Sequence, residues 1–239
     1  MERLKISGGN AKIEYPSLSL PSGRSCPSAL DCLAKVKIVD GKRKIFDGAV
    51  AKFRCFSATA EAVFPSVYEQ REHNFDLLRE CKTVRDMHNL LDVSIKDSYT
   101  PFRIHVGGDF FNQNYFDAWI EYAGENPHRI FYAYTKSLDY WVERLDELKE
   151  VRNLRLVASR GGRHDDFIRE HELIEAVVVL SEQEAREKNL EIDTDDSLAI
   201  RNTKSFALVI HGTQKQGSEQ ARIVEQNKRN KVHSYSKKR

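Results

Sequence analysis

Short runs of apolar residues recur in the second half of the chain, and each ends at polar or glycine residues before a stretch with helical periodicity. The runs begin 22 to 30 residues apart and cover 102–106, 130–134, 154–158, 176–180 and 206–210. Apolar strands that alternate with helices are typical of parallel βα units. Because crossovers between parallel strands are right-handed, all five strand ends should lie on one face. The pattern predicts an α/β fold in which parallel βα units form a partial or irregular TIM-like barrel.

Polar residues follow these strands directly, and in parallel α/β folds ligands bind at that edge. The residues that the fold should bring together are Asp109, Thr135, Lys136, Ser159, Arg160, Ser181 and His211. Glycines at 107 and 108 would let a ligand approach the backbone, and the Asp109 carboxylate could bind an ammonium or hydroxyl group. The alternative is a tight turn in which Asp109 caps the next helix. We expect a cofactor site at Gly107, Gly108, Asp109 and Lys136, where the lysine could hold a phosphate or carboxylate.

The first part of the chain has a different pattern. Residues 1–25 are rich in Gly, Ser and Pro and should be extended or lie at a sheet edge. Two polar-apolar stretches that meet at Asp40-Gly41 predict a hairpin. A helical pattern then runs from Pro65 to Cys81 and beyond. These features predict a single α/β domain over 1–214, with a cysteine-bearing loop and hairpin region at 1–64 and the helix and βα repeats at 65–214.

Composition makes this an ordinary globular chain. Of its 239 residues, 40% are hydrophobic and 31% are charged. No apolar run approaches the roughly 18 residues of a membrane helix, and the first residues lack the apolar core of a secretion signal. We therefore expect a cytoplasmic protein that does not enter a membrane. In that compartment, cysteines are metal ligands or free thiols more often than disulfides.

The four cysteines are the candidate metal ligands. Cys26 and Cys32 are six positions apart in a loop-like stretch, Cys55 follows a short apolar segment, and Cys81 lies in the helical pattern. Four thiolates would suit zinc or an iron–sulfur cluster, and three would leave one iron of a 4Fe-4S cluster open. The spacing alone matches neither a zinc ribbon nor the cysteine run of radical enzymes, and cysteines without a metal explain it about as well. His105 and His211 are further candidates, although a strand histidine is more often a buried, hydrogen-bonded residue.

The end of the chain is basic. From Lys215 onward there are eight Lys or Arg residues against two acids, Glu219 and Glu225. This segment, 215–239, is poor in apolar residues and is predicted to be a mobile tail. A basic tail can bind nucleic acid by neutralising phosphates. It can equally be a solvated terminus that aids solubility.

Several strings resemble a phage family described as "gene product 88". They are SGGNAKIEYPSLSLPSGRSCPSALDC, FRCFSATAEAVFPSVYEQREHN, RIHVGGDFFNQNYFDAWIEYAGENP and FYAYTKSLDYW. The resemblance covers roughly residues 5–165 and includes Cys26, Cys32 and Cys55, the Gly108-Asp109 exit and the run Tyr134-Thr135-Lys136. It implies a phage protein made in the cytoplasm of a bacterial host, and it implies no reaction.

A more distant likeness is to radical S-adenosylmethionine enzymes. These combine a partial βα barrel, a three-cysteine cluster at the strand ends and a Gly-Gly-Glu sequence on the second strand. Gly107-Gly108-Asp109 would take that place, although the dispersed cysteines and the aspartate depart from the pattern and put binding of S-adenosylmethionine in doubt. The resemblances favour a 4Fe-4S cluster on Cys26, Cys32 and Cys55, with Cys81 as a fourth ligand if its helix returns to the site.

Three functional hypotheses follow. The first is an iron–sulfur protein, with radical or redox chemistry at the carboxyl ends of the strands. The second is a nucleic-acid-binding phage protein whose iron–sulfur or zinc site is structural. The third is a zinc-stabilised protein that binds a host protein, for which the sequence gives no positive sign.

Overall fold

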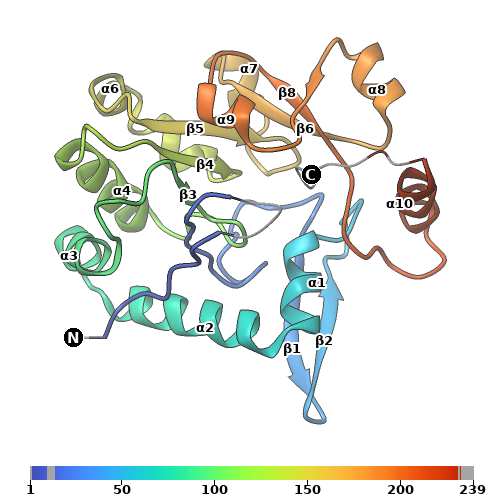
Figure 1. Ribbon diagram of the computed structural model, residues 1–239, viewed down its shortest axis with the longest axis horizontal. Coiled ribbons are helices and arrows are strands. Elements are labelled where there is room, and N and C mark those ends of the chain that lie inside the picture. The colour runs from blue at the N-terminus through green and yellow to red at the C-terminus, as the bar shows by residue number, and fades with distance from the viewer. Residues whose placement is uncertain (1, 10–13, 231, 233–239) are drawn as a thin grey trace.

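The protein is built around a parallel sheet. The structure is a computed structural model that describes residues 2–9, 14–230 and 232. Within these residues the main sheet has six parallel strands in the order β3-β4-β5-β6-β8-β7 (Figure 1). Their bounds are Phe102–Ile104, Phe131–Thr135, Leu154–Ser159, Glu175–Val179, Phe206–Val209 and Glu191–Ile192, in that order. The five predicted strands are confirmed to within two residues, and β7 is an additional strand at one edge.

The sheet has two differently covered faces. In β4, Phe131 and Ala133 belong to the large core on the helical side, whereas Tyr132 packs in a second core on the opposite side. The helices that follow the strands are α4 (Gln113–Glu125), α5 (Leu138–Val142), α6 (Leu145–Glu150), α7 (Asp166–Glu170) and α8 (Glu182–Glu187). The short helix α9 (Ser197–Arg201) contacts β4 and β5 and contributes Leu198 and Ala199 to the second core. The prediction of parallel βα units is confirmed, but closure into a barrel is not seen among the described strands.

An extended segment near the N-terminus lies beside β3. Arg103 N donates to the Pro16 carbonyl oxygen at 2.9 Å, and Leu18 N donates to the Arg103 carbonyl oxygen at 3.2 Å. Farther along, Leu20 N donates to the Gly107 carbonyl oxygen at 2.8 Å. The bridge between Ser17 and Arg103 is parallel. The segment therefore extends the parallel sheet, and the loop that carries Cys26 leaves its carboxyl end.

The cysteine-bearing region adds a hairpin and a helix. Strands β1 (Ala34–Val39) and β2 (Lys42–Asp47) pair antiparallel across the predicted turn, and α1 (Phe56–Val63) packs on them. Two helices follow, and they correct the prediction of one helix through Cys81. Helix α2 (Pro65–Glu80) ends with Cys81 as its C-cap residue, and α3 (Val84–Ser94) begins at a capping box formed by Thr83 and Asp86. The helices are separate because the backbone is extended at Cys81, which ends α2, and at Thr83, which begins α3.

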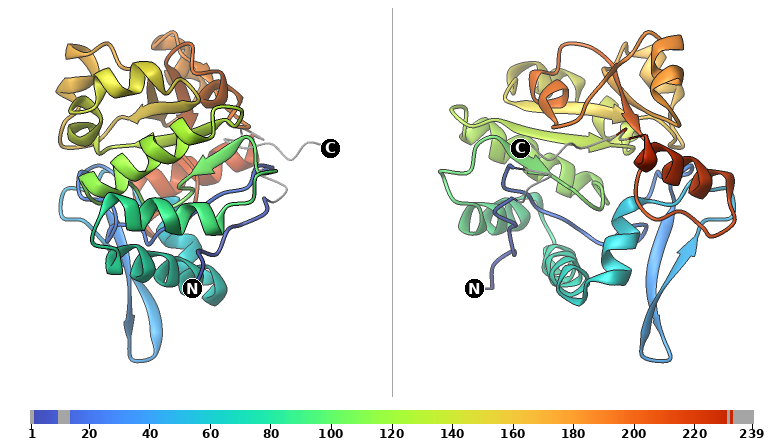
Figure 2. Two further views of the ribbon diagram at one scale, coloured as in Figure 1. Left: turned by 90° about the vertical axis from the view of Figure 1, so that its left-hand side faces the viewer. Right: turned by 45° about the vertical axis from the view of Figure 1, so that its right-hand side comes forward.

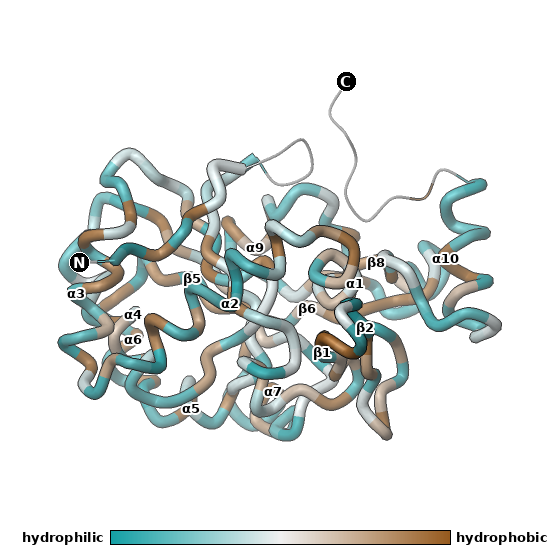
Figure 3. Tube along the Cα trace, turned by 90° about the horizontal axis from the view of Figure 1, so that it is seen from below, coloured by the Kyte–Doolittle hydropathy of each residue, from teal (hydrophilic) through white to brown (hydrophobic). Residues whose placement is uncertain are grey.

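Part of the basic C-terminal segment, which the sequence predicts to be a mobile tail, is helical. Residues 219–229 form α10 (Glu219–Arg229), which is hydrophilic over most of its length (Figure 3). Val224 and Asn227 are nevertheless buried, and Asn227 Nδ2 donates to the Leu180 carbonyl oxygen at 2.9 Å. These contacts dock the helix on the sheet domain. Residues 231 and 233–239 lie outside the described residues, and nucleic-acid binding by this segment stays a prediction.

Candidate functional site

A cavity lies where the cysteine-bearing region meets the carboxyl ends of the strands. It has a volume of about 150 Å³, roughly five times the share of one water molecule in the liquid. The polar or sulfur-containing lining residues are Cys26, Cys32, Arg54, Cys55, Ser57, Arg103, His105, Asp109, Tyr134, Lys136, Ser159 and His211. Apolar lining residues include Phe53, Val178, Leu208 and Ile210. The cavity thus has the mixed lining of a small-molecule or cofactor site.

Three of the four cysteines meet at this cavity, although Cys26 and Cys55 are far apart in the sequence. The loop of Cys26 and Cys32 is attached to the exit of β5, because Leu30 N and Asp31 N both donate to the Gly161 carbonyl oxygen. The Asp31 carbonyl oxygen in turn accepts from Lys52 N and Phe53 N. These backbone bonds bring Cys32 next to Cys55, the N-cap residue of α1.

The thiols of Cys32 and Cys55 interact directly. Cys55 donates a hydrogen bond to the Cys32 sulfur, which lowers the pKa of Cys32 to about 6 despite its burial; the positive charge of Lys136 lowers it further. The same hydrogen bond raises the pKa of Cys55 well above its ordinary value. Burial, followed by the negative charge of Asp109, raises the pKa of Cys26. The pair therefore presents one thiolate at neutral pH, and thiolates are the form that binds soft metals.

The donor chemistry of this site fits a soft metal, but the donors do not converge on a point. Within the described residues, no three His, Cys, Asp or Glu side chains are arranged to hold one metal ion. The predicted metal-binding site is therefore not shown by the geometry of the described residues. What the structure brings together is three sulfur donors around one cavity.

The Asp109 carboxylate accepts hydrogen bonds from neighbouring segments of the protein. Its Oδ1 accepts from Thr135 Oγ1 at 2.6 Å and from Phe110 N at 2.8 Å, and its Oδ2 accepts from Lys136 N at 2.8 Å. Burial raises the pKa of Asp109 to about 6, against the opposing effect of these hydrogen bonds. The helix-capping alternative is wrong, because Asn112 caps α4 and accepts from Tyr115 N. Asp109 thus links the segments that follow β3 and β4. Because its carboxylate already accepts three hydrogen bonds, it has little acceptor capacity left for a ligand.

Gly107 and Gly108 line the cavity, and close packing accounts for the absence of a side chain at both positions. A Cβ atom on Gly107 would lie 2.1 Å from Ser57 Oγ and 2.7 Å from the Arg71 guanidinium. Gly108 has a φ of +89°, and a Cβ there would lie 2.6 Å from Leu20 Cβ and from Ser25 Oγ. The glycines let the cysteine-bearing region approach the strand exit.

Lys136 also has its donors engaged. Its Nζ donates to the Ser159 carbonyl oxygen, Ser159 Oγ and the Arg160 carbonyl oxygen at 2.7, 2.8 and 2.8 Å. The ammonium group joins the exits of β4 and β5 and carries a buried positive charge beside Cys32. This lysine can stabilise a negative group in the cavity through its field, which requires no further hydrogen bond.

Cys81 is not among the gathered cysteines. It lies at the end of α2, packs against the main core, and its Sγ donates to the Leu77 carbonyl oxygen at 3.5 Å. The hollow that it lines also involves Glu2, Glu80 and Asp86, and shares no residue with the cavity of the other cysteines. The structure therefore supplies three cysteines to the site.

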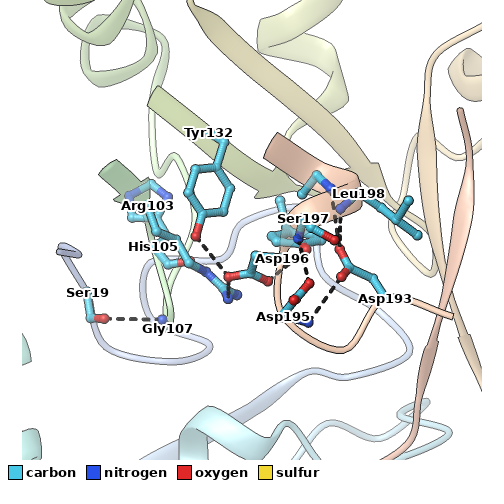
Figure 4. Close-up of polar contacts among 12 residues, drawn as sticks. Ser19, Arg103, His105, Gly107, Tyr132, Asp193, Asp195, Asp196, Ser197 and Leu198 are labelled. Atoms are coloured by element: carbon cyan, nitrogen blue, oxygen red, sulfur yellow. Dashed lines mark hydrogen bonds and ion pairs between the residues drawn. The ribbon is translucent and has the colours of Figure 1, made fainter. Parts of the chain in front are cut away.

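A polar cluster that the sequence did not predict lies on the cavity side of the sheet (Figure 4). Arg103 Nη1 donates to Asp196 Oδ2 at 2.7 Å, and Tyr132 and Tyr134 donate their hydroxyls to the same carboxylate at 2.9 and 3.0 Å. Arg103 and Tyr134 also line the cavity. A charged residue inside the apolar strand at 102–106 was the available signal, because only the face away from the helices could accommodate it.

Together, fold and cavity define an α/β protein with a candidate binding site at the carboxyl ends of a parallel sheet. The chain belongs to the Gene product 88 family, whose model matches residues 3–231. It is 33% identical over 140 residues to the Gene 88 protein of Mycobacterium phage L5, a match that covers 54% of this chain and 51% of the relative. The Gene 88 protein of Mycobacterium phage D29 is 32% identical over the same length and shares. The chain thus matches about half the length of these relatives.

The comparisons confirm the resemblance to the gene product 88 family and support a phage protein with an α/β fold. They do not show the likeness to radical S-adenosylmethionine enzymes, and no solved structure matches this chain. No helix in the described ranges is both long and apolar enough to cross a membrane. A location in the bacterial cytoplasm and a host-protein partner stay predictions.

Proposed function

We propose that this protein binds a 4Fe-4S cluster through Cys26, Cys32 and Cys55. The observation that carries the proposal is that these three cysteines, drawn from separate parts of the sequence, line one cavity at the carboxyl ends of the strands. Cys81 lies elsewhere, so the proposed cluster has three protein thiolates. Its fourth iron would be open to a small molecule in the cavity.

The number of cysteines at the cavity, three and not four, favours a cluster with an open iron over a structural zinc ion. A structural zinc ion needs four donors that converge on one point, and the described residues contain no group of three such donors. The thiolates of a 4Fe-4S cluster bind different irons, so they surround a volume and need not converge. The three cysteines at the cavity match the number of thiolates that a cluster with one open iron needs, and the hydrogen-bonded thiols of Cys32 and Cys55 would have to separate to bind two irons.

The surroundings are suited to an anionic, water-sensitive group. The Lys136 ammonium group and the Cys32 thiolate attract each other, and the same charge would stabilise a cluster that carries negative thiolates. Val178, Leu208 and Ile210 form an apolar part of the wall. When bound, a cluster with an open iron would supply electron transfer or Lewis-acid activation of a small molecule.

The likeness to radical S-adenosylmethionine enzymes would add two features to this proposal, a partial barrel and the binding of S-adenosylmethionine. The radical-enzyme likeness implies three cysteines at the strand ends beside the Gly107-Gly108-Asp109 exit, and both sets of residues line the cavity. Asp109, which would hold the amino group of S-adenosylmethionine, instead binds Thr135, Phe110 and Lys136. We therefore propose the cluster without that cofactor.

Anaerobic purification followed by optical and electron paramagnetic resonance spectroscopy tests the proposal. The expected result is a broad visible absorption that bleaches on reduction, together with a paramagnetic signal of the reduced cluster. Cyanide should change that signal, because one iron lacks a protein ligand. A colourless protein that contains zinc would contradict the cluster, and a cluster whose signal is insensitive to cyanide would contradict the open iron.

A further inference from the structure

The hairpin of β1 and β2 projects away from the body of the protein. Figures 1 and 2 show it extending past α1 and α2 from different directions. Its turn is tight because Asp40 and Gly41 both have a positive φ, of 52° and 71°. Cross-strand pairing runs without interruption from Ala34↔Asp47 to Val39↔Lys42. The hairpin is therefore a regular two-stranded ribbon with a free end.

The two faces of this ribbon differ in chemistry. Ala34, Val36 and Ile45 pack on one face against α1, and Arg43 Nε donates to the Ala62 carbonyl oxygen at 3.3 Å. The opposite face presents the directly paired residues Lys35 with Phe46, Lys37 with Lys44, and Val39 with Lys42. We call this second side the lysine face. It carries four lysines and no acidic residue, and all four lysines are exposed.

The charges on the lysine face are poorly neutralised. Lys37 and Lys44 are directly opposite each other, a like-charge pairing that destabilises an isolated sheet. Lys44 has one ion pair, with the exposed Asp40 at 3.5 Å, and such pairs contribute little in water. Lys35, Lys37 and Lys42 have no ion pair among the described residues, and the Lys37 ammonium group lies 5.5 Å from the centre of the Phe46 ring. An anionic partner would remove this repulsion.

We propose that the lysine face of the ribbon binds duplex DNA. A two-stranded β-ribbon fits the major groove of B-form DNA, which is about 12 Å wide. Six-residue strands extend about 20 Å, enough for several phosphates on both sides of a groove. The narrow major groove of duplex RNA does not admit such an element. Single strands are bound mainly by successive aromatic residues, and the lysine face has only Phe46.

Fluorescence anisotropy with a DNA duplex of about two helical turns tests this site. The variant Lys37→Ala/Lys42→Ala/Lys44→Ala should bind about 10- to 100-fold more weakly at moderate salt. The slope of its log affinity against log salt should become less negative by about 2 to 3, because each lost phosphate contact removes about 0.9 from the magnitude of that slope. The matched control, Arg152→Ala/Arg169→Ala/Lys188→Ala, removes three exposed positive charges outside the hairpin and the basic C-terminal segment, and it should bind like wild type.

Several results would overturn the proposal. Wild-type protein could fail to bind the duplex at low salt, or the ribbon variant could keep the wild-type affinity and salt slope. Equal loss in this three-charge control would show that total charge, and not the ribbon, determines binding. Duplex RNA or single-stranded DNA of the same sequence bound as tightly as the DNA duplex would also contradict it. Unchanged thermal unfolding of the variants shows that any loss of binding is local, because the substituted side chains are exposed.

Discussion

The carboxylate of Asp109 accepts a hydrogen bond of 2.6 Å from the hydroxyl of Thr135, and both side chains are buried. One residue follows β3 and the other ends β4, so this bond joins two neighbouring strand exits. The same carboxylate binds Lys136 N and Phe110 N. The buried Asp109 carboxylate therefore fixes the relative positions of the two strand ends at the candidate site.

Replacing this carboxylate should destabilise the fold. In Asp109→Asn, one oxygen becomes an amide that faces N–H and O–H donors, so at least one buried donor loses its acceptor. Hydrogen bonds to charged groups contribute about 1.5–3 kcal/mol each, and we expect a loss of about 2–4 kcal/mol in the free energy of unfolding. Denaturant titration measures it. Asp146→Asn on the exposed surface is the control and should change nothing measurable; equal stability of Asp109→Asn and wild type would refute the assigned role.

The glycine at the β3 exit should be sensitive for a steric reason. Gly108→Ala combines a positive φ with a Cβ 2.6 Å from Leu20 and Ser25, and we expect a cost of about 2–4 kcal/mol. Gly41→Ala is the matched control, because its φ is also positive but no atom lies within 4 Å of the added Cβ. That variant should lose only about 1 kcal/mol, the strain of the backbone. Similar losses in thermal unfolding for the two variants would show that packing at Gly108 is unimportant.

The buried ion pair on the cavity side of the sheet should respond to the loss of one partner. Asp196→Asn leaves the Arg103 guanidinium buried without its negative partner but keeps an acceptor for the tyrosine hydroxyls and a residue that tolerates the φ of 65° here; removing one charge of such a pair typically costs about 3–5 kcal/mol. The double variant Arg103→Leu/Asp196→Asn should recover much of that loss, since neither charge remains. Chemical denaturation of the single and double variants provides the comparison. A double variant that loses the sum of both single losses would contradict a direct coupling.

His105 should make stability dependent on pH. Its ring is buried, and burial, with a contribution from Arg103, lowers the pKa of His105 to about 3. The unfolded chain binds a proton near pH 6.5 and the folded protein does not, so stability is complete above about pH 6.5 and falls as pH decreases toward 3. His105→Asn cannot titrate, and asparagine tolerates the positive φ of 66° at this position. The slope of the unfolding free energy between pH 6.5 and 4 should therefore be smaller in His105→Asn than in wild type, and equal slopes in the two proteins would contradict this role of His105.

The strands were predictable because buried parallel strands leave a strong local signal. Phe102–Ile104 and Phe206–Val209 are apolar runs bounded by polar or glycine residues, and the structure confirms them. The turn at Asp40-Gly41 was equally clear, since few residues accept two successive positive φ values. The short strand β7 (Glu191–Ile192) and helix α9 carry no such signal, because tertiary contacts with β8 and β4 determine them.

The site was predictable only in part. The sequence predicted that Lys136 and Asp109 directly follow strands. It could not show that the Lys136 ammonium group donates to Ser159 or that the Asp109 carboxylate accepts from Thr135. It also could not place Cys81, whose distance from the other cysteines depends on where α2 ends. The meeting of Cys32 with Cys55 depends on loop hydrogen bonds to Asp31 and Gly161, which no local pattern encodes.

The most direct test of the central claim is the iron and acid-labile sulfide content of anaerobically purified wild type and of Cys26→Ser, Cys32→Ser, Cys55→Ser and Cys81→Ser. We predict about four irons and four sulfides per chain in wild type, the content of a 4Fe-4S cluster. Cys81→Ser should retain them, and each of the other three variants should lose most of them. One zinc without sulfide in wild type, or a loss in Cys81→Ser as large as in Cys32→Ser, would contradict a cluster held by three cysteines.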